Sequence, residues 1–344
     1  MTILRIAFVL PALLLAAHSA TMADPVADFY RGRTITMIVS SAAGGGMDIH
    51  ARMVAPVLAD RLPGKPNIIV QNRPGAGGIV ATNYLYNAAH KDGSVIAVIH
   101  PTIPFAPLFG EPKTSFEATK FNWIGRIDKS SHLCVAWHTA PVQKIADVMT
   151  KELIVGSTGP GSSMASFPYM MNRFFGAKFR VVTGYKGGND IYLAMERGEV
   201  HGRCVLTLNA LRSIHPDWLR DRKINILLQL AREPSDAPEL KGVPTLYDFA
   251  KDDHQRAVME LMFANQELER PVVAPPGVPA DRVAALREAL REALADPKLQ
   301  AEVAQRKMTL NYASGEAVAR VVERAYAAPK SVVATAVESM RPTE

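Results

Sequence analysis

The sequence lacks the residue patterns that mark most enzymes and metal-binding proteins. Cys134 and Cys204 are its only cysteines, which excludes a disulfide framework and a cysteine-rich metal site. None of the nine histidines forms H-E-x-x-H, and neither a G-x-S-x-G nucleophile motif nor a C-x-x-C redox motif occurs. No basic block with interleaved aromatics is present, so we expect no nucleic-acid partner. We therefore expect a binding protein without catalytic residues, metal ions or cofactors.

Long apolar runs are also missing, apart from a short one near the N-terminus. There, Arg5 precedes an apolar stretch at 6–17, which ends in small residues around 19–23. This stretch is too short to span a bilayer as a helix, and its order of charge, apolar run and small residues is that of a secretory signal. We predict that residues 1–23 are a cleaved signal peptide, and that the mature protein is soluble and periplasmic.

The two cysteines each lie in an apolar, strand-like context, at 133–135 and 204–206. In an exported protein, Cys134 and Cys204 could form one disulfide bond. We expect two separate buried thiols instead, since an unpaired cysteine packs as a small apolar residue.

Length and patterning predict an α/β protein with two lobes. A chain of 344 residues exceeds the size at which a single hydrophobic core keeps growing. Apolar runs of strand length alternate with amphipathic helices, as in β-α-β crossovers onto parallel sheets. We assign 24–125 and 255–344 to the first lobe and 126–254 to the second, with a strand at 268–273 that returns the chain to the first lobe.

A loop rich in small residues follows the first apolar strand. The strand at 35–39 leads into residues 40–46 (SSAAGGG) and then into a helix that begins near Asp48. Such a helix start can hold an anion on unpaired N–H groups, and an ordinary strand–turn–helix connection is the alternative. No lysine follows the glycines, and Ile49 stands where a dinucleotide-binding motif needs glycine, so a carboxylate fits better than a nucleotide. We interpret Asp48 as a cap of this helix start.

A second loop of the same kind follows a strand at 152–155. Residues 156–163 (GSTGPGSS) add hydroxyl donors to the helix start, which favours a second anion site over a solvent-exposed linker. The strand at 200–206 carries Arg203 among apolar neighbours. A buried arginine needs an acidic partner or an anionic ligand, and the sequence leaves both open.

An ordered set of short motifs resembles the periplasmic solute-binding receptors of tripartite tricarboxylate transporters, also called the Bug family. The NRPGAGG motif at 72–78 is the most specific of them. The others, in the family's order, are FYRGRTI at 29–35, AGG at 43–45, KDG at 91–93, GSS at 161–163, YKG at 185–187, GEV at 198–200, VPT at 243–245 and APPGVP at 274–279.

The resemblance implies a type II periplasmic-binding fold, in which two lobes, each a mostly parallel sheet flanked by helices, close on a small carboxylate. It also implies partners: the membrane permease subunits of a transporter, or a sensor protein, with the receptor itself a monomer. By position, the ligand-binding residues are expected on the two loops and beside them. On the first lobe these are Ser40, Ser41, Ala43, Gly44 and Gly45, and on the second Ser157, Thr158, Ser162, Ser163 and Tyr185.

The sequence departs from the family pattern at the pocket. The family often has proline near Ser40 and an aromatic residue near Ser41, and it usually has aspartate where this chain has His201. Arg203 stands where the family strand is apolar, so we add it to the expected ligand-binding residues and expect specificity to differ from citrate. Since a fold does not fix a function, a periplasmic enzyme and a partner-binding module remain the alternatives to a receptor.

Overall fold

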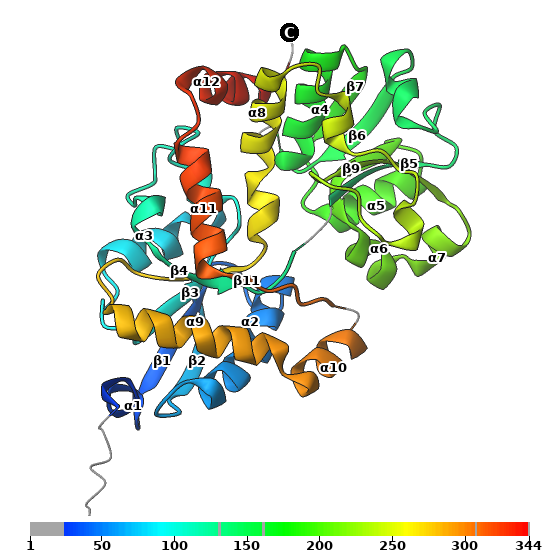
Figure 1. The fold of residues 1–344 in the computed structure, drawn as a ribbon. Helices are drawn as coiled ribbons and strands as arrows, with labels where there is room; N and C mark the ends of the chain where they lie inside the picture. Colours follow the sequence, from blue (N-terminus) through cyan, green and yellow to red (C-terminus); the bar gives the residue numbers. More distant parts are fainter. Residues whose placement is uncertain (1–23, 130–131, 160–161, 307, 343–344) are drawn as a thin grey trace, which may run out of the picture.

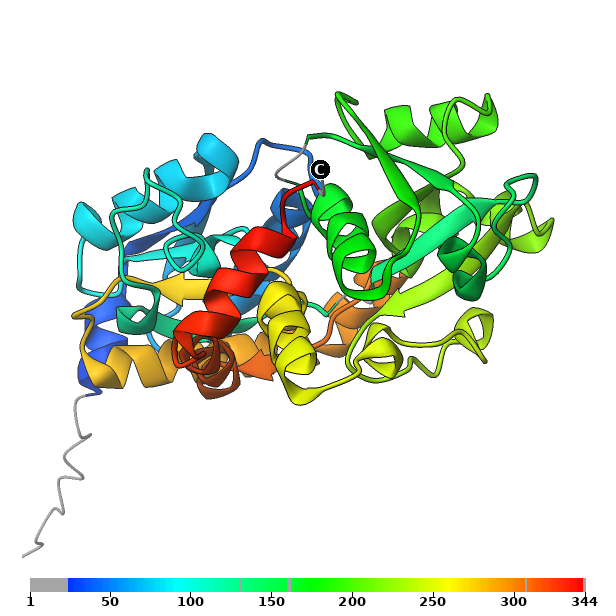
Figure 2. The same ribbon diagram turned by 90° about the horizontal axis from the view of Figure 1, so that it is seen from above.

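The computed structural model describes residues 24–129, 132–159, 162–306 and 308–342. The predicted signal peptide and Gly161 of the second loop lie outside these residues. The chain forms two β-sheets flanked by helices, and the two lobes lie side by side (Figure 1, Figure 2). The predicted α/β architecture with two lobes is therefore confirmed.

The first sheet has six strands in the order β11-β4-β10-β3-β1-β2. Strands β1, β2, β3 and β4 run in one direction, whereas β10 and β11 run in the other. The return of the chain to this sheet through β10, predicted at 268–273, is confirmed. The bounds are β1 Thr34–Val39, β2 Asn67–Asn72, β3 Val95–Val98, β4 Asn122–Arg126, β10 Pro271–Ala274 and β11 Ala313–Ser314.

The second sheet has five strands in the order β7-β6-β8-β5-β9. Only β5 runs against the others, since it pairs antiparallel with both of its neighbours. The carboxyl ends of parallel strands meet at one edge of each sheet, which is where ligands bind in open α/β sheets. The bounds are β5 His132–Trp137, β6 Leu153–Ser157, β7 Phe179–Thr183, β8 Gly202–Thr207 and β9 Ile224–Leu230.

Helices cover both sheets because the strands are apolar on both faces. Helix α9 shows the pattern: Val283, Leu286 and Leu290 recur at three- and four-residue spacing and pack on the first sheet with α2. The bounds are α1 Pro25–Tyr30, α2 Gly46–Arg61, α3 Ile79–Asn87, α4 Ser163–Phe175, α5 Gly188–Glu196, α6 Leu208–Ile214, α7 Pro216–Arg220, α8 Asp253–Phe263, α9 Ala280–Ala295, α10 Pro297–Gln305, α11 Gly315–Tyr326 and α12 Lys330–Ser339.

The last helix connects the two lobes. Helix α12 packs against α8 and against α4, which belongs to the second lobe (Figure 1). Arg173 on α4 forms an ion pair with Glu338 on α12, with an N–O distance of 2.6 Å. One hydrophobic cluster therefore extends from Phe167 on α4, through Phe263 on α8, to Val322 on α11. The assignment of residues 255–344 to the first lobe remains a prediction. Helix α12, the last helix of this segment, contacts α8 as well as α4 of the second lobe.

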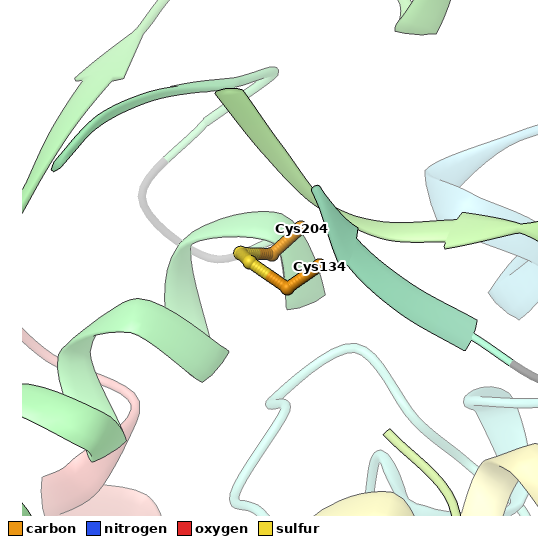
Figure 3. Close-up of a disulfide and its surroundings, with 2 residues drawn as sticks. All are labelled: Cys134 and Cys204. Carbon is orange, nitrogen blue, oxygen red and sulfur yellow. A yellow bond between two sulfur atoms is a disulfide. The ribbon is translucent and has the colours of Figure 1, made fainter. Parts of the chain in front are cut away.

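Cys134 and Cys204 form a disulfide bond, so the expectation of two separate thiols is wrong (Figure 3). Cys134 on β5 lies directly opposite Cys204 on β8 in an antiparallel pair. Both cysteines are buried, and they belong to the same hydrophobic cluster as Phe167 and Met170 of α4. The sequence does not reveal this pairing because the two strands are separated by 70 residues and become neighbours only in the folded sheet.

Candidate functional site

A cavity of about 300 Å³ lies between the two lobes. The first lobe contributes Gly46 and Met47 at the start of α2, and His100, Pro101 and Thr102 after β3. The second lobe contributes His132 on β5, Ser163 at the start of α4 and Val205 on β8. Asn265, Glu269 and Arg270 complete the lining from the segment that leads into β10. Two helix N-termini, one from each lobe, therefore open onto the same cavity.

The first-lobe loop (residues 40–46) is held in place by Asp48, whose side chain is only 3% exposed. Asp48 accepts hydrogen bonds from the Gly44 N–H at 2.8 Å, from Asn72 Nδ2 at 2.9 Å and from Arg52 Nε at 3.0 Å. Burial alone would raise the pKa of the Asp48 carboxyl, but these hydrogen bonds hold its pKa below the ordinary value. Asp48 thus fixes the loop to α2 and to the end of β2, which agrees with its interpretation as a structural residue.

The predicted residues of the first-lobe loop lie close to the cavity, but Gly46 and Met47 are the loop-side residues that line it. Ser40 is buried, with its hydroxyl 3.7 Å from Met47 Sδ, and Ser41 donates no hydrogen bond to the described residues. The three small residues are exposed. These are Ala43, Gly44 and Gly45.

The second-lobe loop (residues 157–163, without 160 and 161) is organised by its hydroxyl groups. Ser157 is fully buried, and its Oγ lies 2.8 Å from Ser162 Oγ. Ser163 lines the cavity as the first residue of α4, and Thr158 is half-buried. The Tyr185 N–H donates to Ser157 O at 3.4 Å, so Tyr185 lies beside the same loop. The structure thus brings the five predicted residues of this lobe to one edge of the second sheet.

Arg203 is buried with 8% of its surface exposed, and among the described residues it forms no ion pair with a carboxylate. Its guanidinium lies 4.7 Å from the centre of the Tyr192 ring and against the start of α5. Gly188 makes this possible, because a Cβ at that position would be 2.3 Å from Arg203 Nη1. Burial lowers the pKa of Arg203 from its ordinary value. Of the two explanations that the sequence leaves open, an acidic partner is therefore not found in the described residues.

A charged cluster at the cavity was not predicted from the sequence. Arg270 Nη1 lies 2.9 Å from Asp128 Oδ2 and 3.6 Å from Glu269 Oε2. The Arg270 side chain also lies against the start of α2, where a Cβ on Gly46 would be 3.5 Å from Nη2. Glu269 Oε1 is 3.8 Å from His132 Nε2. The only signal in the sequence is a pair of opposite charges directly before the returning strand, and such pairs are common on surfaces.

Burial changes the protonation of this cluster. Burial, with the nearby charges of Arg203 and Arg270, lowers the pKa of His132 to about 4, so that His132 is neutral at neutral pH. Burial also raises the pKa of Glu269, against the effect of Arg270. Arg270 lines the cavity itself, whereas Arg203 lies on β8 two residues before the lining residue Val205.

Two further observations mark the same region. Six buried side-chain atoms of the described residues have no hydrogen-bond partner. Four of these are Ser41 Oγ in the first-lobe loop, His132 Nδ1 and Arg270 Nε in the cavity lining, and Arg203 Nε. In addition, Val205 and Arg270 have left-handed backbone conformations, with φ of +58° and +54°. A β-branched residue in this conformation is strained, and such strain is concentrated at functional sites.

Other kinds of site are not evident in the part of the chain that the structure describes. No cluster of three or more histidine, cysteine, aspartate or glutamate side chains there is placed to hold a metal ion. Within the same residues, no helix has the length and apolar character needed to cross a membrane.

Comparisons with known proteins agree on one family. A family model described as the tripartite tricarboxylate transporter family receptor matches residues 50–336. The chain is 42% identical to BugT of Bordetella pertussis over 89 residues, which cover 26% of each protein. It is 24% identical over 329 residues to a UPF0065 protein in the gbd 5' region of Cupriavidus necator, which covers 92% of this chain and 91% of that protein.

Solved structures share the fold. A TctC solute-binding protein from Polaromonas superposes with a TM-score of 0.68 at 22% identity, covering 89% of this chain and 99% of that one. The periplasmic binding protein BugD gives 0.62 at 22% identity, covering 91% and 100%. MatC from Rhodopseudomonas palustris, solved with bound malate, gives 0.60 at 21% identity, covering 88% and 99%. At these identities the likeness establishes the fold alone.

Proposed function

This chain belongs to the family of tripartite tricarboxylate transporter receptors, and we propose that it captures a small carboxylate between its two lobes and delivers it to a membrane transporter. Its family and fold are those of solute-binding receptors. One member of the fold, MatC, was solved with malate, and another from the same organism with adipate. These ligands support a carboxylate as the ligand class for this chain.

The observation that carries the proposal is a cavity between the lobes onto which two helix N-termini open, with the buried Arg203 two residues before the lining residue Val205 on β8. A buried cation without a carboxylate partner is costly for the protein, and an anionic ligand would compensate it. The start of α2 at Gly46 and the start of α4 at Ser163 provide N–H groups and the positive ends of helix dipoles. A carboxylate that contacts both lobes would favour the closed arrangement, because those contacts are lost when the lobes separate.

We propose that the ligand contacts both predicted loops. Ser162, Ser163 and Arg203 are the second-lobe groups closest to this role, with Ser157, Thr158 and Tyr185 supporting them. The first-lobe residues Ser40, Ser41, Ala43, Gly44 and Gly45 shape the start of α2, whose Gly46 and Met47 face the cavity. The protein acts in the periplasm as a monomer, after export by the signal peptide predicted at 1–23. Its partners are permease subunits or a sensor.

The test is a thermal-shift screen of mono-, di- and tricarboxylates, aromatic acids and amino acids. We expect at least one acid to raise the melting temperature and to be recovered unchanged by NMR, whereas turnover would favour the alternative of a periplasmic enzyme. If no acid has an effect but the protein still binds a membrane or sensor protein, a partner-binding module is the better description.

The substitution Arg203→Met sharpens the test. It should weaken the binding of the best ligand by about 30-fold, because a charge-assisted contact is lost. The melting temperature of the ligand-free protein should stay constant or rise, because an unpaired buried charge is removed. Arg197→Met, at an exposed arginine after α5, is the matched control and should leave affinity unchanged. Equal affinities of the wild type and the Arg203 variant would remove Arg203 from the site.

A further inference from the structure

Glu269 places a carboxylate at the cavity that is proposed to receive a carboxylate. Its side chain is 14% exposed, and the residue lines the cavity between the lobes. A negative charge at this position repels an anionic ligand, so the ligand must either keep its carboxylate away from Glu269 or bring a compensating group. The charges around Glu269 decide between these two possibilities.

Arg270 is the positive charge nearest to Glu269, and it also pairs with a second carboxylate. Arg270 lies 3.6 Å from Glu269, but its shortest ion pair, at 2.9 Å, is with the buried Asp128. Asp128 is fixed further by the Thr309 hydroxyl at 2.8 Å and by the Lys129 N–H at 2.8 Å. One arginine therefore faces two carboxylates, and the cluster of Asp128, Glu269 and Arg270 carries a net negative charge when Glu269 is ionised.

His132 does not compensate this charge. Its Nε2 lies 3.8 Å from Glu269, but burial and the two arginines keep the imidazole neutral at neutral pH. Among the described residues, no donor lies within hydrogen-bond distance of either Glu269 oxygen. Glu269 is therefore an acceptor at the cavity that a ligand can use.

Arg203 provides the opposite charge on the second lobe. It is buried without a carboxylate partner in the described residues, beside the start of α5. The structure thus offers a positive part at Arg203, on the strand whose Val205 lines the cavity, and a negative part at Glu269 in the lining itself. A ligand that carries only carboxylates can use the first part but not the second.

We infer that Glu269 is a specificity-determining residue that selects an amino-carboxylate, a ligand with a protonated amine as well as a carboxylate. This inference rests on the proposed receptor function and narrows its ligand class. The ammonium group pairs with Glu269, while the carboxylate is held near Arg203 and the starts of α2 and α4. A ligand whose second carboxylate reaches Glu269 is rejected by like-charge repulsion.

Two matched ligand series test the inference by isothermal titration calorimetry: alanine, lactate and propionate, and aspartate, malate and succinate. Within each series the compounds differ only in an amino group, a hydroxyl group or hydrogen at one carbon. We expect the amino member of at least one series to bind at least about tenfold more tightly than its two analogues. Glu269→Gln should reduce this preference to less than about threefold.

Three variants serve as comparisons. Glu267→Gln removes an exposed carboxylate two residues away, which pairs with Arg324 at 3.6 Å, and should keep the wild-type preference. Glu269→Asp retains the charge and should keep most of the preference, which separates a charge effect from loss of packing. Circular dichroism checks that each variant is folded.

The outcomes distinguish the inference from the function on which it rests. An acid without an amine that binds as tightly as the amino member, or a preference that Glu269→Gln leaves unchanged, overturns the inference while a carboxylate receptor stands. Binding of none of the six compounds counts against the proposed function, and the inference then fails with it.

Discussion

The two loops that border the cavity have similar sequences but are stabilised in different ways. The first-lobe loop depends on one ionised side chain, Asp48, which joins Gly44, Arg52 and Asn72. The second-lobe loop depends on the neutral hydroxyl pair of Ser157 and Ser162, next to a strand that is covalently attached to its neighbour by the disulfide. The same type of helix start is thus held by charge in one lobe and by neutral and covalent bonds in the other.

This difference predicts that the two lobes respond to different conditions. Acid should affect the first-lobe loop, because protonation removes the charge of Asp48. Reducing agents should affect the second lobe, because they open the disulfide between β5 and β8. The following variants test that contrast.

The largest effect is expected for the disulfide. The bond closes a loop of 70 residues, and the restriction of the unfolded chain by a loop of this length contributes about 4 kcal/mol of stability. Replacing both Cys134 and Cys204 with alanine should lower the free energy of unfolding by about this amount. Urea denaturation measures it. A reducing agent should destabilise the wild type but leave the double variant unchanged, and equal sensitivity of the two would contradict the disulfide.

A smaller loss is expected for Asp48→Asn. The variant keeps the size of the side chain but replaces charge-assisted hydrogen bonds from Arg52 and Gly44, which should cost about 2 kcal/mol at neutral pH. Arg52 is half exposed, so solvent screens part of the ion pair and keeps the cost below that of a fully buried pair. Asp60→Asn, at an exposed position of α2, is the control.

The difference in stability between the wild type and Asp48→Asn should change with pH in one direction. The pKa of Asp48 is lower in the folded protein than its ordinary value of 3.8, so its contribution to stability is complete above about pH 4 and is lost as the pH falls through the folded pKa. The difference between wild type and variant should therefore shrink in strong acid. Thermal unfolding from pH 7 to pH 2 checks this, and a difference that is constant over that range would show that the charge has no role.

The smallest effects are expected for two serines. Ser162→Ala removes a hydroxyl that lies 2.8 Å from Ser157 Oγ and should cost about 1 kcal/mol. Ser41→Ala removes a hydroxyl that has no hydrogen-bond partner among the described residues, so its effect should be close to zero. Ser331→Ala, at an exposed position of α12, is the control. Equal losses for Ser41 and Ser162 would show that the hydroxyl pair does not stabilise the second loop.

The sequence by itself determined the two lobes, the strand that returns through β10 and the two small-residue loops. These features follow from local patterns: apolar runs of strand length, glycine-rich connections and helix starts, all readable within about ten residues. The role of Asp48 as a structural residue also follows from its place at a helix start. The ordered motifs further indicated the receptor family, which the family comparison establishes.

Only the tertiary structure decided which distant groups meet. The disulfide between Cys134 and Cys204 depends on the pairing of β5 with β8. The charged cluster of Asp128, Glu269 and Arg270 is formed by two segments that are more than 140 residues apart in the sequence but lie side by side in the fold. Long-range contacts of this kind are not encoded in any local pattern, because they arise from the order of the strands in the sheets. The sequence predicts an anion site at residues 40–46, and the cavity that Gly46 lines also has the carboxylate of Glu269 in its lining.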